Sequence, residues 1–442
     1  MQKSFILSLV AIAFINFAGF SQNIDRAKLD AYFNTLFENN RFMGSVAIAQ
    51  GGELIYSKTV GFADVEQGIK ANQNSKFRIG SITKTFTAAL ILKAVEENRL
   101  SLNQTIDRWF PTIGYANEIT IEHLLRHRSG LRNFTDAEWM SSDRRTQPKT
   151  REEMMEMIKK GGNDFAPNAA MAYSNSGYVL LTFILEDVYE KSFSTILNEK
   201  IVNPLGLENT RLGGKIDSQN NETHSYTFLN GNWKRETESD MSIPLGAGGM
   251  ISTPADLVTF SYALFNGKLI SENSLQQMKT IKDRFGMGVF QMPFHNKIGF
   301  GHTGGIDGFR SVFAYFPDDK ISFAIVSNGL VINHNDISII VLSAAYGKPF
   351  EIPEFTTFDA TGVDLNQFVG IYSSQQIPLQ MTITNVDNQL FGQATGQPAF
   401  PLEMTGENRF EFQQVGAVLE FNPAENTMEL RQGGGVFNFE RE

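Results

Sequence analysis

Residues 78 to 86 read R-I-G-S-I-T-K-T-F and open a segment whose apolar residues recur at helical spacing as far as Leu100. Ser81 and Lys84 are three residues apart, so a helix would place them on one face, one turn apart. A serine hydroxyl is a weak nucleophile at neutral pH and needs a neighbouring base, which an amine can supply. Serine is also a common helix cap. The stretch alone therefore leaves two alternatives, a nucleophile with its base or an ordinary helix start.

Two later stretches also carry polar groups suited to catalysis. A-Y-S-N-S-G-Y, at 172–178, contains Tyr173 and Asn175. A buried tyrosine flanked by cations could have a lowered pKa and act as a general base, and an asparagine could hold a substrate amide. G-H-T-G-G-I-D-G-F, at 301–309, follows a β-run, and its small residues would let a substrate approach a free strand edge. The alternatives are a polar turn with a packed tyrosine and a glycine-rich hairpin turn.

The composition excludes several classes of protein. The chain has 442 residues, is 42% hydrophobic, and carries a formal charge of -10 with no cysteine. Disulfide scaffolds, thiolate metal sites and cysteine nucleophiles are therefore excluded. No Lys/Arg block stands out, so we expect no nucleic-acid partner. His123 and His127 have a spacing that can hold zinc, but H-E-x-x-H and an obvious third ligand are absent, so we expect no metal and no other cofactor.

The N-terminal residues have the layout of a secretory signal. Lys3 precedes a short apolar run from Phe5 to Phe17, and Gly19-Phe20-Ser21 forms a small-x-small cleavage site. The alternatives are a buried helix or a membrane anchor, but the run is short for a bilayer. We therefore expect residues 1–21 to be a signal peptide and the protein to be exported, either to the periplasm or as a secreted protein.

The hydrophobic pattern predicts an α+β fold for residues 22–347. A helix pattern from Ile24 to Phe37 precedes two β-runs around Gly51-Gly52, which predict a hairpin. Helical patches dominate about 101–245, and β-runs return from Phe285 before a final helical run. We expect an antiparallel sheet flanked by helices, plus an all-helical subdomain inserted at about 101–245.

The last part of the chain differs in kind. After a linker at 348–364, short alternating runs recur from Leu365 to the end, separated by turn residues. This pattern predicts a small all-β C-terminal domain at 365–442, a β-sandwich or a barrel. Gly433-Gly434-Gly435 lacks a following Lys-Ser/Thr, so we interpret it as a turn or bulge and not as a phosphate loop.

Six blocks occur in one order and together resemble a known family. They are R-I-G-S-I-T-K-T-F, I-T-I-E-H-L-L-R-H-R-S-G-L, F-A-P-N-A-A-M-A-Y-S-N-S-G-Y, P-L-G-L-E-N-T, G-A-G-G-M-I-S-T-P-A-D-L and G-H-T-G-G-I-D-G-F. The resemblance is to class C β-lactamases, serine D-alanyl-D-alanine carboxypeptidases and related esterases, over roughly residues 24–347. It implies an α/β domain with an antiparallel sheet, an all-helical domain and a cleft between them.

The resemblance also implies a role for each site residue. Ser81 would be the acylated nucleophile and Lys84 its proton partner, with Tyr173 as the general base and leaving-group acid. The implied substrate-binding residues are Asn175 for the amide, His302, Thr303 and Gly304 of the strand motif, and Gly305, whose N–H would form the oxyanion hole with that of Ser81.

Two positions depart from the family pattern. His302 stands where the β-lactamases usually carry lysine, and a neutral imidazole attracts a substrate carboxylate less than an ammonium does. Efficient β-lactam hydrolysis is therefore less expected. Asn168 follows Pro167 where glycine is common, and asparagine tolerates left-handed backbone angles.

The sequence therefore predicts an exported serine hydrolase that acts through a Ser81 acyl-enzyme. Its substrate would be a small molecule or peptide with an amide or ester bond: a D-amino-acid peptide, a small ester or a β-lactam. The alternative is a non-hydrolysing sensor or binding protein for peptidoglycan or penicillin. The sequence gives no oligomeric state.

Overall fold

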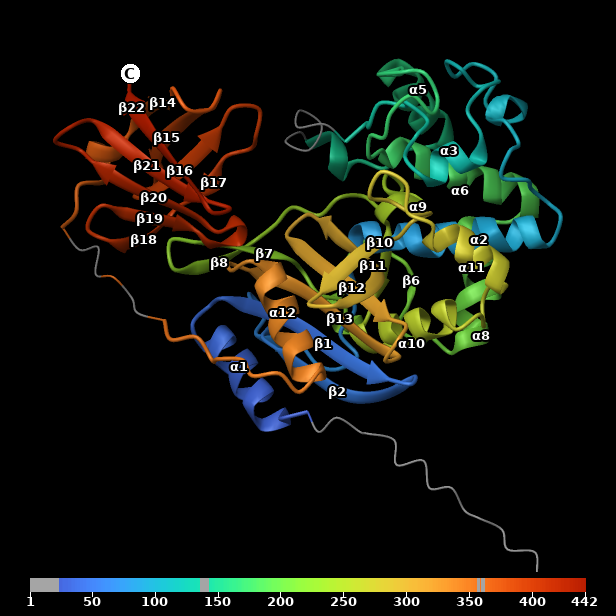
Figure 1. Cartoon of the computed structure of the whole chain (residues 1–442), viewed down its shortest axis with the longest axis horizontal. Coiled ribbons are helices and arrows are strands. Elements are labelled where there is room, and N and C mark those ends of the chain that lie inside the picture. The colour runs from blue at the N-terminus through green and yellow to red at the C-terminus, as the bar shows by residue number, and fades with distance from the viewer. Residues whose placement is uncertain (1–23, 136–142, 356–357, 359–361) are drawn as a thin grey trace, which may run out of the picture.

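The computed structural model describes residues 24–135, 143–355, 358 and 362–442, arranged in three parts (Figure 1). The central sheet with α1 and α12 lies below, the helices α3, α5 and α6 lie at the upper right, and a β-rich C-terminal part lies at the left. The expected signal peptide falls outside the described residues. None of the helices described is both long and apolar enough to cross a membrane.

The central sheet has the strand order β10-β11-β12-β13-β1-β2, with every neighbouring pair antiparallel. A hairpin, β7-β8, joins it by a short parallel pairing with β13. Its strands are β1 (Phe42–Gln50), β2 (Glu53–Val60), β7 (Tyr226–Leu229), β8 (Asn232–Arg235), β10 (Phe290–Phe294), β11 (Lys297–Ile306), β12 (Phe309–Phe316) and β13 (Ile321–Leu330). The hairpin predicted around Gly51-Gly52 is the β1-β2 pair.

Helices cover both faces of this sheet, because alternate residues of its central strands point to opposite sides. On β13, Phe323 and Ile325 pack with α1 (Arg26–Glu38) and α12 (His334–Ala345). Ala324 and Val326 face the other way, into a core shared with α10 and the helical part. The sheet is therefore buried on both faces, which explains the continuous burial of β13.

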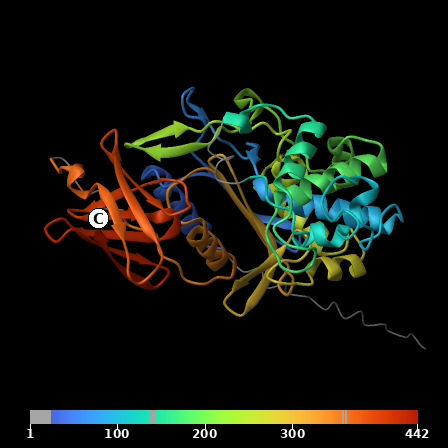
Figure 2. The same cartoon turned by 90° about the horizontal axis from the view of Figure 1, so that it is seen from above.

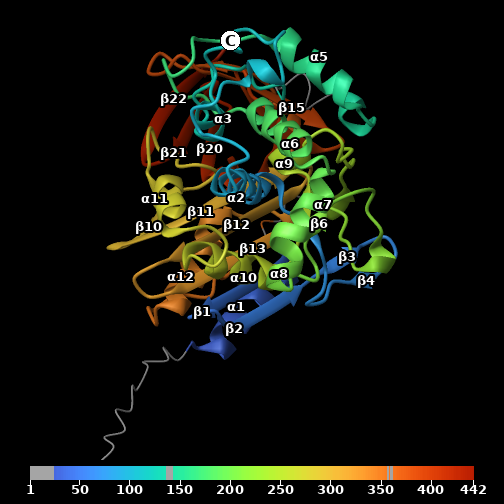
Figure 3. The same cartoon turned by 90° about the vertical axis from the view of Figure 1, so that its right-hand side faces the viewer.

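The helical part packs against α2, which lies between the sheet and the helices above it (Figure 3). Eleven of the fourteen residues of α2 are buried, so this helix is a core element and not an amphipathic surface helix. The α-helices of this region are α2 (Thr83–Glu96), α3 (Ile121–Leu125), α5 (Arg151–Gly161), α6 (Asn175–Tyr189), α7 (Phe193–Leu197), α8 (Asn203–Leu205), α9 (Leu245–Gly248), α10 (Pro254–Phe265) and α11 (Glu272–Lys279). Shorter turns of helix are η1 (Gly80–Ile82), η2 (Ile106–Arg108), η3 (Asp143–Thr146), η4 (Asn198–Val202) and η5 (Ser218–Asn220).

The stretch at 101–245 is not purely helical, because it also contains β6 (Arg211–Leu212) and the β7-β8 hairpin. Asn230 and Gly231 both have positive φ at the tip of this hairpin, as a type I′ turn requires. The Asn-Gly pair between Y-T-F-L and N-W-K-R was the sequence signal for it. Two small sheets complete the main part: β3 (Phe62–Asp64) with β4 (Ile69–Lys70), and β9 (Met250–Ser252) between β5 (Phe77–Arg78) and β6.

The β-run expected from Phe285 begins later, at Phe290. Gly288 has φ +68 and passes so close to α2 that a Cβ there would lie 2.7 Å from the carbonyl oxygen of Lys84. The segment before β10 is therefore a turn packed on α2, because its glycines favour positive φ and close contact over an extended chain.

The C-terminal part forms one nine-stranded antiparallel sheet, β17-β16-β15-β14-β22-β21-β20-β19-β18, around its own hydrophobic core. One continuous sheet makes it barrel-like and not a two-sheet sandwich. Its elements are η6 (Leu365–Phe368), β14 (Gly370–Ser373), β15 (Gln380–Val386), β16 (Gln389–Ala394), β17 (Phe400–Pro401), β18 (Glu403–Gly406), β19 (Arg409–Phe412), η7 (Gln413–Val415), β20 (Ala417–Asn422), β21 (Thr427–Gln432) and β22 (Gly435–Arg441). Gly433 and Gly434 form the predicted turn between β21 and β22. The domain limits proposed from the sequence stay predictions.

The β7-β8 hairpin reaches toward the C-terminal part (Figure 2). Asn230 N donates to Gln389 Oε1 at 2.9 Å. Arg41, before β1, pairs with Glu403 at 2.5 Å. These contacts place the C-terminal part against the β7-β8 hairpin and the segment before β1.

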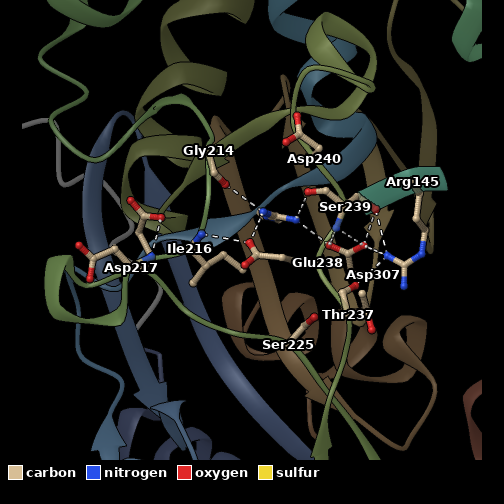
Figure 4. A network of polar contacts seen from close by, with 12 residues as sticks. Arg145, Gly214, Ile216, Asp217, Ser225, Thr237, Glu238, Ser239, Asp240 and Asp307 are labelled. Carbon is tan, nitrogen blue, oxygen red and sulfur yellow. Dashed lines mark hydrogen bonds and ion pairs between the residues drawn. The ribbon is translucent and has the colours of Figure 1, made fainter. Parts of the chain in front are cut away.

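A buried ion network ties the turn after β11 to the region before Ser81 (Figure 4). Asp307 Oδ2 accepts from Arg78 Nη1 and Asp307 Oδ1 from Arg145 Nη1, both at 2.7 Å. Ser239 adds its hydroxyl at 2.7 Å, and Glu238 pairs with Arg78 at 2.8 Å. The side chains of Asp307 and Arg78 are each only 1% exposed, so both charges depend on these partners.

We predict that Asp307→Ala lowers the free energy of unfolding of the main part by about 3 kcal/mol or more, because Arg78 and Arg145 lose a buried counterion. Urea denaturation followed by tryptophan fluorescence measures this, since Trp109, Trp139 and Trp233 all precede the C-terminal part. Asp318→Ala is the matched control, because Asp318 is exposed in the turn after β12. Equal urea midpoints for the two variants would contradict the prediction.

Candidate active site

Ser81 lies in the short helical turn η1, directly before α2, with its side chain half-buried. The preceding Gly80 has φ +49, and a Cβ there would lie 2.7 Å from the backbone nitrogen of Gly305. Glycine at position 80 therefore allows η1 to lie directly against β11. The fold brings together Ser81 and Gly305, which the sequence analysis placed in one oxyanion hole.

Lys84 is fully buried beneath Ser81. Its Nζ lies 3.2 Å from Ser81 Oγ, 2.7 Å from Asn175 Oδ1 and 2.6 Å from the carbonyl oxygen of Ala247. Burial holds the pKa of this amine well below its ordinary value. A neutral amine has two N–H donors, which match the two acceptors Asn175 and Ala247, and a lone pair that is left for the hydroxyl of Ser81.

Tyr173 lies beside this amine, with Lys84 Nζ 4.8 Å from the centroid of its ring. The expectation of a lowered pKa is wrong. Burial raises the pKa of Tyr173 above its ordinary value, although a hydrogen bond with Ser81 acts in the opposite direction. The nearby amine is itself held neutral by burial, so it supplies little charge to stabilise a phenolate. Tyr173 is therefore a neutral phenol at neutral pH, able to donate its proton.

His302 is buried on β11 and faces the site, 6.3 Å from the ring of Tyr173 and 5.0 Å from that of Phe290 between centroids. Its Nδ1 lies 2.5 Å from the carbonyl oxygen of Thr303. Burial, together with the charge of Lys84, lowers the pKa of His302 to about 3. The imidazole is thus neutral at pH 7, so this position supplies no cation for a substrate carboxylate.

The edge of β11 beside Ser81 has no strand partner in the part of the chain that the structure describes. β10 pairs with β11 only as far as Gly301, which leaves 302–306 open on that side. Gly304 lies so close to Ile79 that a Cβ would come within 2.0 Å of its carbonyl oxygen. Thr303 is exposed. The open edge can accept a substrate backbone in the manner of an added strand, as the sequence suggested.

A cavity of 270 Å³ opens over Ser81, and we call it the Ser81 cavity. It is lined by Ser81, Phe134, Thr135, Arg145, Asn175, Ser239, Ile243, Pro244, Ala247, Gly248, Gly305 and Ile306. Asn175 opens helix α6, and both polar ends of its amide are engaged: Oδ1 by Lys84, and Nδ2 by Thr135 Oγ1 at 2.8 Å. In this structure Asn175 therefore positions Lys84 as well as lining the cavity.

Sequence reasoning missed Thr135, Arg145, Ser239 and the Ala247 carbonyl. Thr135 and Ser239 lie on loops, Arg145 lies in the short turn η3, and Ala247 contributes a main-chain oxygen, and in none of these places does a periodicity or motif mark the group as part of a site. Only the block G-A-G-G-M-I-S, which contains Ala247, carried a signal through the family resemblance.

His123 and His127 have separate structural roles. His123 Nδ1 accepts from Thr120 N at the start of α3, and His127 packs on Tyr173 with 4.3 Å between ring centroids. Within the described residues, no group of three or more His, Asp or Glu side chains could hold a metal ion. Asn168 has φ +65, in line with the tolerance expected of asparagine after Pro167.

Comparisons with known proteins identify relatives over most of the chain. The chain is 27% identical over 435 residues to penicillin-binding protein 4* of Bacillus subtilis (strain 168), covering 91% of this chain and 94% of that protein. It is 27% identical to the teichoic acid D-alanine hydrolase of Staphylococcus aureus (strain NCTC 8325 / PS 47), over 71% of this chain and 75% of that protein.

Solved structures extend the comparison to the fold. D-amino acid amidase from Ochrobactrum anthropi SV3, complexed with L-phenylalanine amide, has a TM-score of 0.63 at 26% identity, covering 73% of this chain and 99% of that chain. The octameric penicillin-binding protein homologue from Pyrococcus abyssi has a TM-score of 0.65 at 23% identity, covering 94% and 100%. The family model described as Beta-lactamase matches residues 29–346. The chain therefore belongs to the beta-lactamase family and is a serine hydrolase.

Proposed function

We propose that this protein is an exported hydrolase that removes a D-amino-acyl group, such as D-alanyl, from an ester or amide through a Ser81 acyl-enzyme. The observation that carries the proposal is the amine of Lys84, buried and placed 3.2 Å from Ser81 Oγ, beside the open edge of β11. Teichoic acid D-alanine hydrolase and D-amino acid amidase, both similar to this chain, act by name on D-amino-acyl bonds.

In the acylation step, the neutral Lys84 amine takes the proton of Ser81 while Oγ attacks the substrate carbonyl carbon. The backbone N–H groups of Ser81 and Gly305 stabilise the oxyanion. The bond from the carbonyl carbon to the leaving oxygen or nitrogen then breaks. The leaving group takes a proton from the Tyr173 phenol, which regains one from Lys84.

In the deacylation step, water replaces the leaving group. Lys84, with Tyr173, removes a proton from the water as its oxygen attacks the carbonyl carbon of the Ser81 ester, and the same proton is returned to Ser81 Oγ when the bond from that carbon to Oγ breaks. The products are the free amino acid and the resting enzyme, so no cofactor is consumed. Penicillins are the less favoured substrates, because His302 is neutral where a cation would meet their carboxylate.

Export is part of the proposal and rests on residues 1–21, which combine Lys3, an apolar run and a small-x-small site. Acylated cell-envelope polymers lie outside the cytoplasm, so an exported enzyme would meet substrates of this chemistry.

We predict that Ser81→Ala lowers turnover of D-alanyl esters by about a thousandfold or more, because the nucleophile is lost. Intact-protein mass spectrometry after exposure to D-alanyl esters, D-Ala-D-Ala peptides and penicillins would show an acyl adduct on the native chain and none on the variant. Ser194→Ala, on α7, is the matched control. Unchanged turnover in Ser81→Ala would refute the mechanism, and a stable adduct without turnover would identify a sensor.

We also predict that the pH profile of kcat/KM for a neutral ester has an acid limb and a plateau through neutral pH. Protonation of Lys84 at low pH removes the base, and its lowered pKa keeps the amine neutral at pH 7. The raised pKa of Tyr173 keeps the phenol protonated across the plateau.

Two variants separate these roles. Lys84→Arg introduces a permanent cation and is expected to abolish the plateau. Tyr173→Phe is expected to lower kcat by about 10²- to 10⁴-fold and to leave the acid limb in place, since the base remains. A rate that climbs steadily into alkaline pH in the native protein, and loses that climb in Tyr173→Phe, would instead make a tyrosinate the base.

A further inference from the structure

A second cavity, of 670 Å³, lies on the face of β10, β11 and β12 that α12 covers, and we call it the Arg310 cavity. Its polar lining includes Thr303, Arg310, His334 and Asn335, and the rest is largely apolar. Gly305 lines both this cavity and the Ser81 cavity. The two cavities therefore lie on opposite sides of β11 and share Gly305 on its open edge, so a substrate cleaved at Ser81 would reach the Arg310 cavity by passing round this edge.

Arg310 is an exposed cation on β12. It is paired with Gly305 on the neighbouring strand β11. Its Nη1 would lie 3.5 Å from a Cβ on Gly305, so the guanidinium occupies the space that a side chain at position 305 would fill. Among the described residues it donates to the main-chain oxygens of Phe309, at 2.9 Å, and Asp307, at 3.4 Å.

Arg310 forms no ion pair with any residue that the structure describes. The carboxylate of Glu236 interacts electrostatically with Arg310, but it already accepts a hydrogen bond from the hydroxyl of Thr227. The guanidinium therefore keeps donors for an external anion.

Two further groups around the cavity suit an anion. The N-terminus of α12, a helix of 12 residues, lies at the cavity through His334 and Asn335. The Nε2 atom of His334 is buried and has no hydrogen-bond partner among the described residues. Burial and the charge of Arg310 lower the pKa of His334 to about 4, so its ring is neutral at pH 7 and can donate one N–H. Asp336 is the acidic residue in the first turn of α12. Burial raises the pKa of Tyr32 on α1, and the negative charge of Asp336 raises it further.

We propose that the Arg310 cavity binds a phosphate carried by the leaving group, so that the preferred substrate is a D-amino-acyl ester of a phosphate-bearing polyol. This rests on the proposed function and deepens it. The Arg310 guanidinium and the His334 imidazole N–H are the donors for a tetrahedral anion, and the positive end of the α12 dipole adds to their attraction, although Asn335 N already donates to Asn333 Oδ1 at 2.8 Å.

The phosphate takes no part in the bond changes. The ester bond between the acyl carbon and the polyol oxygen breaks, Ser81 Oγ takes the acyl group, and the polyol leaves with a proton from Tyr173. The acyl group occupies the Ser81 cavity beside Asn175, and the polyol phosphate extends past Gly305 toward Arg310. The phosphate ester itself remains intact and leaves with the alcohol.

A matched pair of substrates tests this assignment: D-alanyl glycerol phosphate and D-alanyl glycerol, which differ only in the phosphate. The full-length native protein is expected to show a higher kcat/KM for the phosphate form. Arg310→Gln is expected to lower kcat/KM for the phosphate form by about 10- to 100-fold, which corresponds to the loss of one charged hydrogen bond. The same variant should leave kcat/KM for the neutral ester unchanged. Arg310→Lys should recover part of the loss, and Arg26→Gln, an exposed cation on α1, should change neither rate.

Equal losses on both substrates in Arg310→Gln, or no loss on either, would overturn the inference while leaving the hydrolase intact. Calorimetric titration of glycerol 3-phosphate into the resting protein gives a readout that needs no turnover. Binding that Arg310→Gln abolishes would uphold the site even if no D-alanyl ester were cleaved, which would refute only the proposed function. Glycerate binding as tightly as glycerol 3-phosphate would reassign the cavity to carboxylates and overturn the phosphate.

Discussion

The amine of Lys84 has no contact with solvent, and its position is set by three acceptors or donors that come from three separate parts of the chain: Ser81, Asn175 and Ala247. Removing an ammonium from water without a carboxylate is costly, and the cost falls when the amine loses its proton. The fold therefore holds Lys84 as a neutral base before any substrate binds. The pairing of α2 with α6 and α9 is what keeps water away from it.

Two close backbone contacts hold Ser81 and its buried base beside the open edge of β11. Gly80 lies against Gly305, and Gly304 lies against the carbonyl of Ile79, at distances that leave no room for a Cβ. Ser311 strengthens the second contact by donating to that carbonyl at 2.8 Å. The turn η1 and the strand β11 are thus held as one unit, and the nucleophile cannot move away from the oxyanion N–H without breaking both contacts.

The parts of the fold that could be predicted from sequence are those with strong periodicity or turn chemistry. The β1-β2 hairpin, α2 and the turn at Gly433-Gly434 follow from alternation, helical spacing and glycine. The resemblance was needed to join Ser81, Tyr173 and His302, because those residues lie far apart in the chain and only tertiary contacts bring them together. Neither route could give the protonation states, since the pKa of Tyr173 depends on burial that no local pattern records.

Charge placement connects the catalytic and binding parts of the molecule. A lysine at position 302 would put a second amine beside Lys84 and Tyr173, at a position where the charge of Lys84 already helps to lower the pKa of His302. The buried imidazole of His302 leaves proton transfer at Ser81 undisturbed by a second charge. A cation without an ion pair among the described residues is instead Arg310, on the opposite face of the sheet and beside Gly305. Because the strand separates the two, a bound anion can be recognised without raising the pKa of the amine that must stay neutral.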